Sequence, residues 1–263
     1  MYARNGNPNQ HWLEEKVAAL HGADDAIVLG SGVAALHDLF WTLLKTGDRV
    51  VYPKVSYMAV YRLFHELFNQ KFGVETVMVD MTDLEAVKKA ITPGTRLVHI
   101  ETPDNPTDGI SDIEAIAKIA HENEAVLSVD NTFASPLNQR PLDLGADFVV
   151  ESLTKYINGH GDAQGGAIIS NDLAAMDRIR YEAQVNVGSV ISPFNAWQIF
   201  RGAVTFPLRM ERINASTQKI AEWLEQRQNV TFVSYPGLAS HPGHELAKKQ
   251  MKHGFGGVIS FGI

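Results

Sequence analysis

The sequence contains no cysteine among its 263 residues. This absence excludes disulfide bonds, thiolate ligands for zinc or iron–sulfur clusters, and a thiol nucleophile. A catalyst built from this chain must therefore use lysine, histidine, tyrosine, serine, threonine, carboxylates or a cofactor.

Long hydrophobic runs and blocks of one charge are also missing. No apolar run reaches the roughly 18 residues of a membrane span, and no charged-then-apolar leader opens the chain. The formal net charge is −7 at pH 7, whereas nucleic-acid binding requires a clustered basic surface. We therefore expect a soluble, cytoplasmic protein that binds neither nucleic acid nor membrane.

Short apolar segments rich in valine and isoleucine alternate with amphipathic stretches along most of the chain. Strands that are apolar at nearly every position are typical of sheets covered on both faces. The alternation predicts an α/β fold with a mostly parallel, seven-stranded sheet flanked by helices. The expected strands are 26–29, 49–52, 76–80, 96–101, 125–130, 147–151 and 166–170.

Two helix starts are readable because Thr82 to Glu85 and Ser111 to Glu114 both fit a capping box. The pattern changes near Phe206, where a long helical stretch at 208–227 is followed by a strand at 230–233 and turn-rich segments. A last strand is expected at 257–263, with no visible partner. We expect a second, smaller domain that is incomplete.

Polar residues follow three of the expected strands, at the sheet edge where open parallel sheets bind ligands. The turn from Gly30 to Gly32 opens a helix and can cradle a phosphate, although it could be a simple tight connection. Asp130 could pair with a protonated ring nitrogen, bind a metal or cap a helix. Lys155 follows two hydroxyl residues and could react with an aldehyde or be a surface charge. Together the three strand ends match the needs of pyridoxal phosphate.

At these residues the sequence resembles the cysteine/methionine-metabolism family of pyridoxal-phosphate enzymes. That family includes cystathionine γ-synthase, cystathionine γ-lyase and methionine γ-lyase. The matching segments follow the family's order across nearly the whole chain, and the stretch from Asp130 to Asp162 is the most specific. They are 2–4, 30–35, 101–106, 129–136, 140–147, 152–160, 192–194 and 235–238.

The resemblance implies a role for each matching residue. Lys155 would form the Schiff base with the cofactor and move protons between substrate carbons, and Asp130 would pair with the pyridine nitrogen. Tyr57 would stack on the ring and help expel the γ substituent, and Asn105 would lie near the phenolic oxygen. Tyr57 could instead be core packing and Asn105 a turn residue.

The resemblance also assigns the groups that bind the cofactor's phosphate. Within the chain these are main-chain amides of the glycine turn and two hydroxyl side chains. Two further residues would reach across to the phosphate of a neighbouring subunit. The first group comprises Gly32, Val33, Ser152 and Thr154, and the second Tyr2 and Arg4. Ser31 reads as a structural turn residue.

The family likeness implies the fold-type I arrangement and a γ-elimination on methionine, cystathionine or homocysteine that yields 2-oxobutyrate, ammonia and a thiol. The alternative is γ-replacement by a synthase or sulfhydrylase, and canavanine-like substrates stay open. We expect a homo-oligomer, a tetramer built from two dimers with shared active sites. The expected division is an arm remnant at 1–7, a cofactor domain at 8–206 and an incomplete small domain at 207–263. The arginine that binds the substrate carboxylate is expected beyond that last segment.

The sequence departs from the family at Met58, where glycine is common, and at Glu151, where histidine is frequent. Other classes fit less well. A dinucleotide-binding enzyme would need an acid after the second strand, where Tyr52 and Pro53 stand. A serine hydrolase would need its lysine–threonine–glycine element after the Ser–Lys pair, not before it. His160 and Asp162 alone do not predict a metal site, and a binding module without catalysis stays open.

Overall fold

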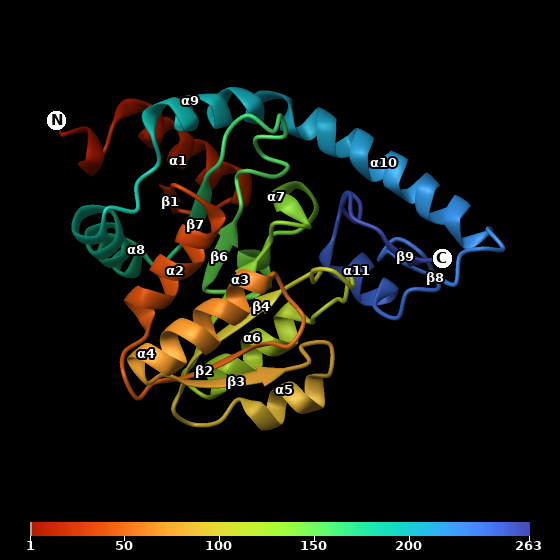
Figure 1. The fold of residues 1–263 in the computed structure, drawn as a ribbon, viewed down its shortest axis with the longest axis horizontal. Helices are drawn as coiled ribbons and strands as arrows, with labels where there is room; N and C mark the ends of the chain where they lie inside the picture. Colours follow the sequence, from red (N-terminus) through yellow and green to blue (C-terminus); the bar gives the residue numbers. More distant parts are fainter. Residues whose placement is uncertain (1) are drawn as a thin grey trace.

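The computed structural model describes residues 2–263, so Met1 of the expected arm at 1–7 lies outside the described residues. A seven-stranded sheet forms its centre, in the order β1-β7-β6-β5-β4-β2-β3 (Figure 1). Strand β7 runs antiparallel to both neighbours, and the other pairs are parallel. The strands are β1 Asp25–Leu29, β2 Arg49–Pro53, β3 Glu75–Val79, β4 Thr95–Glu101, β5 Val126–Asp130, β6 Phe148–Glu151 and β7 Gly166–Ser170.

Both ends of each of these seven strands lie within one residue of the sequence expectation, and the mostly parallel sheet is confirmed. The expected burial on both faces is wrong for β3, where Met78 is 48% exposed. This strand lies at the edge of the sheet and pairs only with β2. An apolar strand sequence does not reveal whether its position is central or at an edge.

Helices cover both faces of the sheet because successive strand residues point to opposite sides. In β1, Ile27 and Leu29 pack with α2 and α8 on one face, while Ala26 and Val28 pack with α1 and α9 on the other. Helices α5 and α6 cover the second face over β2, β4 and β5. The α-helices of this layer are α1 Pro8–His21, α2 Gly32–Leu43, α5 Leu84–Ala90, α6 Ile113–Glu122, α8 Leu173–Ile179 and α9 Pro193–Gly202.

Shorter and irregular helices complete the molecule. Two of them are π-helical, η2 Arg62–Asn69 and η4 Arg180–Val187. The others are η1 Ala3–Asn5, α3 Met58–Tyr61, α4 Gln70–Phe72, α7 Ser135–Asn138, η3 Pro141–Leu144, η5 Ala203–Thr205 and α11 His244–Gln250. Within residues 2–263, no helix has the length and apolar character needed to cross a membrane.

The N-cap predicted by each of the two capping boxes is one residue too early in the sequence. The N-cap of α5 is Asp83, whose carboxylate accepts from the amides of Glu85 and Ala86, both at 3.1 Å. The N-cap of α6 is Asp112, which accepts from the amide of Ala115 at 3.0 Å. In both segments an aspartate directly follows the hydroxyl residue, and its carboxylate satisfies the free amides of the first turn.

The C-terminal part contains α10 Phe206–Glu225 and a separate two-stranded sheet of β8 Phe232–Ser234 and β9 Ser260–Gly262. The expectation that the last strand has no partner is wrong, because β9 pairs antiparallel with β8. Figure 1 places this sheet and α11 beside the large sheet, under α10. The division into segments 1–7, 8–206 and 207–263 stays a prediction.

Candidate active site

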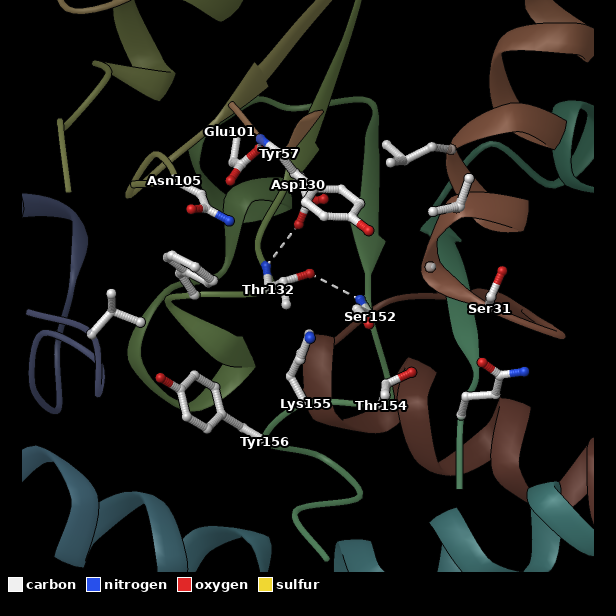
Figure 2. A pocket seen from close by; sticks show the side chains of 16 residues that line it. Ser31, Tyr57, Glu101, Asn105, Asp130, Thr132, Ser152, Thr154, Lys155 and Tyr156 are labelled. Carbon is white, nitrogen blue, oxygen red and sulfur yellow. Dashed lines mark hydrogen bonds between the residues drawn. The ribbon is translucent and has the colours of Figure 1, made fainter. Parts of the chain in front are cut away.

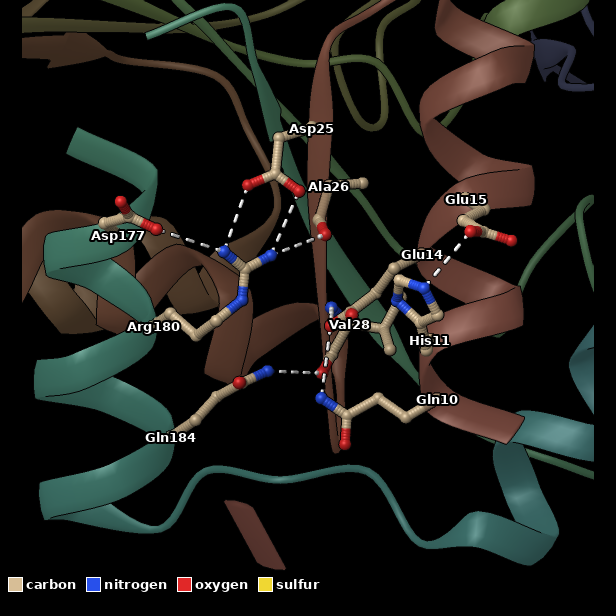
Figure 3. A network of polar contacts seen from close by, with 10 residues as sticks. All are labelled: Gln10, His11, Glu14, Glu15, Asp25, Ala26, Val28, Asp177, Arg180 and Gln184. Carbon is tan, nitrogen blue, oxygen red and sulfur yellow. Dashed lines mark hydrogen bonds and ion pairs between the residues drawn. The ribbon is translucent and has the colours of Figure 1, made fainter. Parts of the chain in front are cut away.

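A pocket of about 550 Å³ lies at the carboxyl ends of the central strands (Figure 2). Such edges are where parallel sheets bind ligands. Eight of the ten predicted site residues line this pocket. They are Gly32, Val33, Tyr57, Asn105, Asp130, Ser152, Thr154 and Lys155.

Tyr2 and Arg4, the other two predicted residues, do not line the pocket. Arg4 donates to the main-chain oxygens of Gln184, at 3.2 Å, and Val185 in η4. Tyr2 is 67% exposed, and the guanidinium of Arg4 lies 5.4 Å from its ring centroid. The expected contact of these residues with a neighbouring subunit stays a prediction.

The glycine turn forms the anion-binding end of the pocket. Ser31 caps α2, because its hydroxyl accepts a hydrogen bond from the amide of Ala34 at 3.1 Å. The cap leaves the amides of Gly32 and Val33 at the helix N-terminus, where the helix dipole favours an anion. A Cβ at Gly32 would lie 3.0 Å from the Cβ of Ser152, so a side chain would fill this cradle.

The segment after β6 carries Lys155 into the pocket. The amide of Ser152 donates to the hydroxyl of Thr132 at 2.9 Å, which ties the end of β6 to the end of β5. The hydroxyl of Thr154 donates to the main-chain oxygen of Gly165 at 3.2 Å and accepts from its amide at 3.1 Å. Figure 2 shows the Lys155 side chain extending toward Thr132 and Ser152.

Arg209 in α10 holds the main chain that follows Lys155. Its guanidinium donates to the main-chain oxygens of Tyr156 at 2.6 Å, Ile157 at 3.0 Å and Gly202 at 3.1 Å. A planar guanidinium with five donors suits several carbonyls at once, whereas a lysine does not. The clamp fixes the loop from which Lys155 projects, and the sequence pattern did not reveal it.

Asp130 and Glu101 end neighbouring strands as register partners and line the same pocket. Asp130 Oδ1 accepts from the amide of Thr132 at 3.0 Å, and Glu101 Oε2 accepts from the amide of Tyr57 at 2.7 Å. Burial, with the neighbouring charge of Asp130, raises the pKa of Glu101 well above its usual range. Burial also raises the pKa of Asp130, while hydrogen bonds from Thr132 oppose that rise.

Glu101 was not among the predicted site residues. Its position gave a usable indication, because it is the last residue of an expected strand and opens the family segment at 101–106. The other pocket residues missed from the sequence are Leu36, Thr132, Phe133, Tyr156, Gln164 and Val258, and Ser31 also lines the pocket.

Glu151, a departure from the family pattern, does not line the pocket. It is 1% exposed, accepts from the side-chain amide of Asn131 at 3.0 Å, and lies 3.4 Å from Nε2 of buried His21. Burial raises the pKa of Glu151 and lowers the pKa of His21 to about 3. Burial thus favours the uncharged form of both groups, which form a polar contact within the core.

The pocket can hold a flat aromatic ring that carries an anionic group. The glycine turn offers main-chain amides at one end, and the carboxylate of Asp130 and the amine of Lys155 line the same pocket. Apolar surface is provided by Val33 and Phe133. A pyridine aldehyde that carries a phosphate matches these groups, because the amides suit its phosphate, the acid its ring nitrogen and the amine its aldehyde. The absence of a side chain at Gly32 leaves the space that the phosphate needs.

Comparisons with known proteins agree with this geometry. The profile of the family described as Cys/Met metabolism PLP-dependent enzyme matches residues 1–263. The chain is 48% identical to a canavanine gamma-lyase of Pseudomonas canavaninivorans over 264 residues, covering 100% of the chain and 66% of that protein. It is 47% identical to an L-methionine gamma-lyase of Fusobacterium nucleatum subsp. polymorphum, covering 99% of the chain and 66% of that protein.

A cystathionine gamma-synthase of Mycobacterium tuberculosis is 44% identical over 259 residues, covering 98% of the chain and 66% of that protein. The crystal structure of metB from Corynebacterium glutamicum superposes with a TM-score of 0.96 at 46% identity, covering 99% of the chain and 67% of that structure. The chain thus spans 66% of the length of these curated relatives.

Proposed function

The chain belongs to the family of Cys/Met metabolism PLP-dependent enzymes, and from this premise we propose that the protein catalyses γ-elimination on an amino acid. Its fold is the family's fold-type I arrangement, a mostly parallel seven-stranded sheet flanked by helices. The observation that carries the proposal is the convergence of Lys155, Asp130 and the glycine turn at Gly32 on one pocket.

The cofactor of this family is pyridoxal phosphate, which supplies an aldehyde for amine condensation and an electron-withdrawing ring. In the proposed site, the amides of Gly32 and Val33 and the hydroxyl of Ser152 bind the phosphate. Thr154 orients this loop through Gly165, and its hydroxyl is the second predicted phosphate contact. Lys155 provides the amine that holds the aldehyde.

Two side chains orient the ring in the proposed site. Asp130 binds the ring nitrogen, and a charge-assisted hydrogen bond of this kind contributes about 1.5–3 kcal/mol. Asn105 also lines the pocket, and its side-chain amide would bind the phenolic oxygen. The acid keeps the ring protonated, which strengthens its electron withdrawal.

Two side chains then move protons. With the cofactor bound, the free amine of Lys155 would take the proton from the α carbon of the substrate and act again at the β carbon. Tyr57 is 46% exposed at the pocket and donates a proton to the departing γ substituent. Loss of the γ group leaves an unsaturated amine, and addition of one water molecule would release 2-oxobutyrate and ammonia.

We propose elimination as the main reaction because relatives named canavanine gamma-lyase and L-methionine gamma-lyase share 48% and 47% identity. The substrate class is an amino acid with a sulfur or other heteroatom at the γ carbon, such as methionine, cystathionine, homocysteine or canavanine. Replacement at the γ carbon is the second candidate, since a cystathionine gamma-synthase is 44% identical.

The assembly is also part of the proposal. Tyr2 and Arg4 lie outside the pocket of their own chain, which agrees with a role at the site of a neighbouring subunit in a homo-oligomer. Light scattering of the purified protein would give the mass, and a tetramer is expected. The cytoplasmic location stays a prediction.

The function is tested by incubating the protein and pyridoxal phosphate with one substrate at a time. Methionine, cystathionine, canavanine and an acylated homoserine with and without a thiol are compared, and 2-oxobutyrate, ammonia and substrate consumption are measured. We expect consumption of methionine, cystathionine or canavanine without added thiol. Turnover only with acylated homoserine and thiol would replace elimination by the γ-replacement alternative, and no turnover with any substrate would refute both.

A further inference from the structure

Glu101 is a buried acid of the pocket to which the proposed reaction assigns no role. It is the last residue of β4, is 5% exposed, and faces the pocket beside Asp130 (Figure 2). The two are register partners in parallel neighbouring strands, so their side chains point to the same side of the sheet. A buried acid in this place requires a physical reason, because burial of a carboxylate is costly.

The carboxyl group of Glu101 holds the main chain at Tyr57. The amide of Tyr57 donates to Glu101 Oε2 at 2.7 Å and comes from the residue directly before α3. The side chain of Tyr57 is 46% exposed and leans over the pocket (Figure 2). Because so much of this ring lacks packing, the tether fixes the main-chain position from which the ring projects over the pocket.

The neighbouring Asp130 constrains the charge of Glu101. Burial and the charge of Asp130 both raise the pKa of Glu101, whereas hydrogen bonds from Thr132 favour the ionised form of Asp130. Burial and the neighbouring carboxylate therefore favour the protonated form of Glu101, whose Oε2 accepts from the amide of Tyr57. A protonated Glu101 anchors Tyr57 without adding a second anion beside Asp130.

We propose that Glu101 is a positioning residue of the cofactor site, whose carboxyl group tethers Tyr57 so that the tyrosine ring covers the cofactor held by Asp130 and Lys155. This inference rests on the proposed binding of pyridoxal phosphate. It adds to that function a residue that acts through Tyr57 and touches no reacting atom.

The test compares two side chains of similar length at position 101. Glu101→Gln keeps an oxygen that accepts from Tyr57 and is uncharged, whereas Glu101→Met has no such oxygen. The dissociation constant of pyridoxal phosphate is measured by titrating each cofactor-free protein and following the imine absorbance. We expect Glu101→Gln to stay within about threefold of wild type, and Glu101→Met to bind about tenfold more weakly, the effect of one lost buried hydrogen bond. Glu122→Met, an exposed position at the end of α6, is the control.

A cycle with Tyr57→Ala separates tethering from a general structural effect. If Glu101 acts through the tyrosine ring, the difference between Gln and Met falls below about twofold when Tyr57 is alanine. An unchanged difference in that background would overturn the inference, and so would equal affinities of the Gln and Met variants. If Glu101→Met fails to fold, Glu101→Asp, one methylene short of the Tyr57 amide, takes its place. If wild type forms no imine, the proposed function fails and this inference fails with it.

Discussion

The close contact between β7 and the glycine turn gives a sharp prediction for Gly166→Ala. Gly166 is the first residue of β7 and pairs with Leu29 of β1, directly before the turn. A Cβ added here would lie 2.1 Å from the main-chain oxygen of Ser31 and 2.7 Å from the amide nitrogen of Gly32. An ordinary carbon–oxygen contact is about 3.3 Å, so the two chains must separate by about 1.2 Å.

The strand cannot absorb this movement, because β7 is hydrogen-bonded between β1 and β6. The glycine turn must therefore shift, and the amides of Gly32 and Val33 move away from the phosphate. Overpacking of this kind costs about 1–3 kcal/mol, or a fall of roughly 2–12 °C in the melting temperature for a chain of this size. Loss of one amide–phosphate bond weakens pyridoxal phosphate binding about 10- to 100-fold.

The assay measures the melting temperature of the cofactor-free protein and the dissociation constant of pyridoxal phosphate. The matched control is Gly47→Ala, where φ is +88° and no atom lies within 4 Å of an added Cβ. We expect this control to lose about 1 kcal/mol of stability through backbone strain alone and to keep its cofactor affinity. Wild-type affinity in Gly166→Ala would refute the argument that this glycine sets the position of the anion cradle.

Lys155→Ala should abolish the imine absorbance at ~420 nm. The control Lys118→Ala, on the exposed side of α6, should retain this absorbance. Imine absorbance in Lys155→Ala would mean that another lysine holds the cofactor. Burial raises the pKa of Asp108 to about 8. Between about pH 4 and pH 8 the folded protein therefore holds a proton that the unfolded chain has released. The free energy of unfolding falls over this range by up to about 1.4 kcal/mol per pH unit. Asp108→Asn should therefore gain stability over wild type between pH 5 and 8 in urea unfolding, and a constant difference would contradict this. Arg209→Lys loses the carbonyl clamp behind Lys155, and we expect a loss of about 1–3 kcal/mol in urea unfolding, whereas unchanged stability would show that the clamp is dispensable.

The central sheet could be predicted closely from the sequence because its strands are apolar runs bounded by turn residues. The pairing of β8 with β9 at the C-terminal end could not be predicted from the sequence. Strands β8 and β9 are three residues each and are separated by 25 residues that include α11, so nothing local indicates that they meet. Likewise, β3 has a composition like that of the central strands, and only its place in the sheet order explains why Met78 is exposed.

Half of the pocket residues could be predicted, because their chemistry lies at strand ends and matches a specific family pattern. The supporting residues could not, because they act through contacts between distant segments. Arg209 reaches the loop of Lys155 from 54 positions away, and Gly166 lies beside the glycine turn because its strand β7 is the direct neighbour of β1. Neither residue has a local sequence pattern that distinguishes it from an ordinary surface arginine or strand glycine.

Strand alternation determines which acids face the cofactor pocket. Three neighbouring strands end in an acid, Glu101 on β4, Asp130 on β5 and Glu151 on β6. In the strand register Asp130 is opposite Glu101 on β4 and opposite Val150 on β6. Glu151 is one residue beyond Val150, so its side chain points to the opposite face of the sheet. There it contacts His21 and Asn131. A shift of β6 by one residue would bring a third carboxyl group into the pocket and compete with the single charge that the ring nitrogen requires.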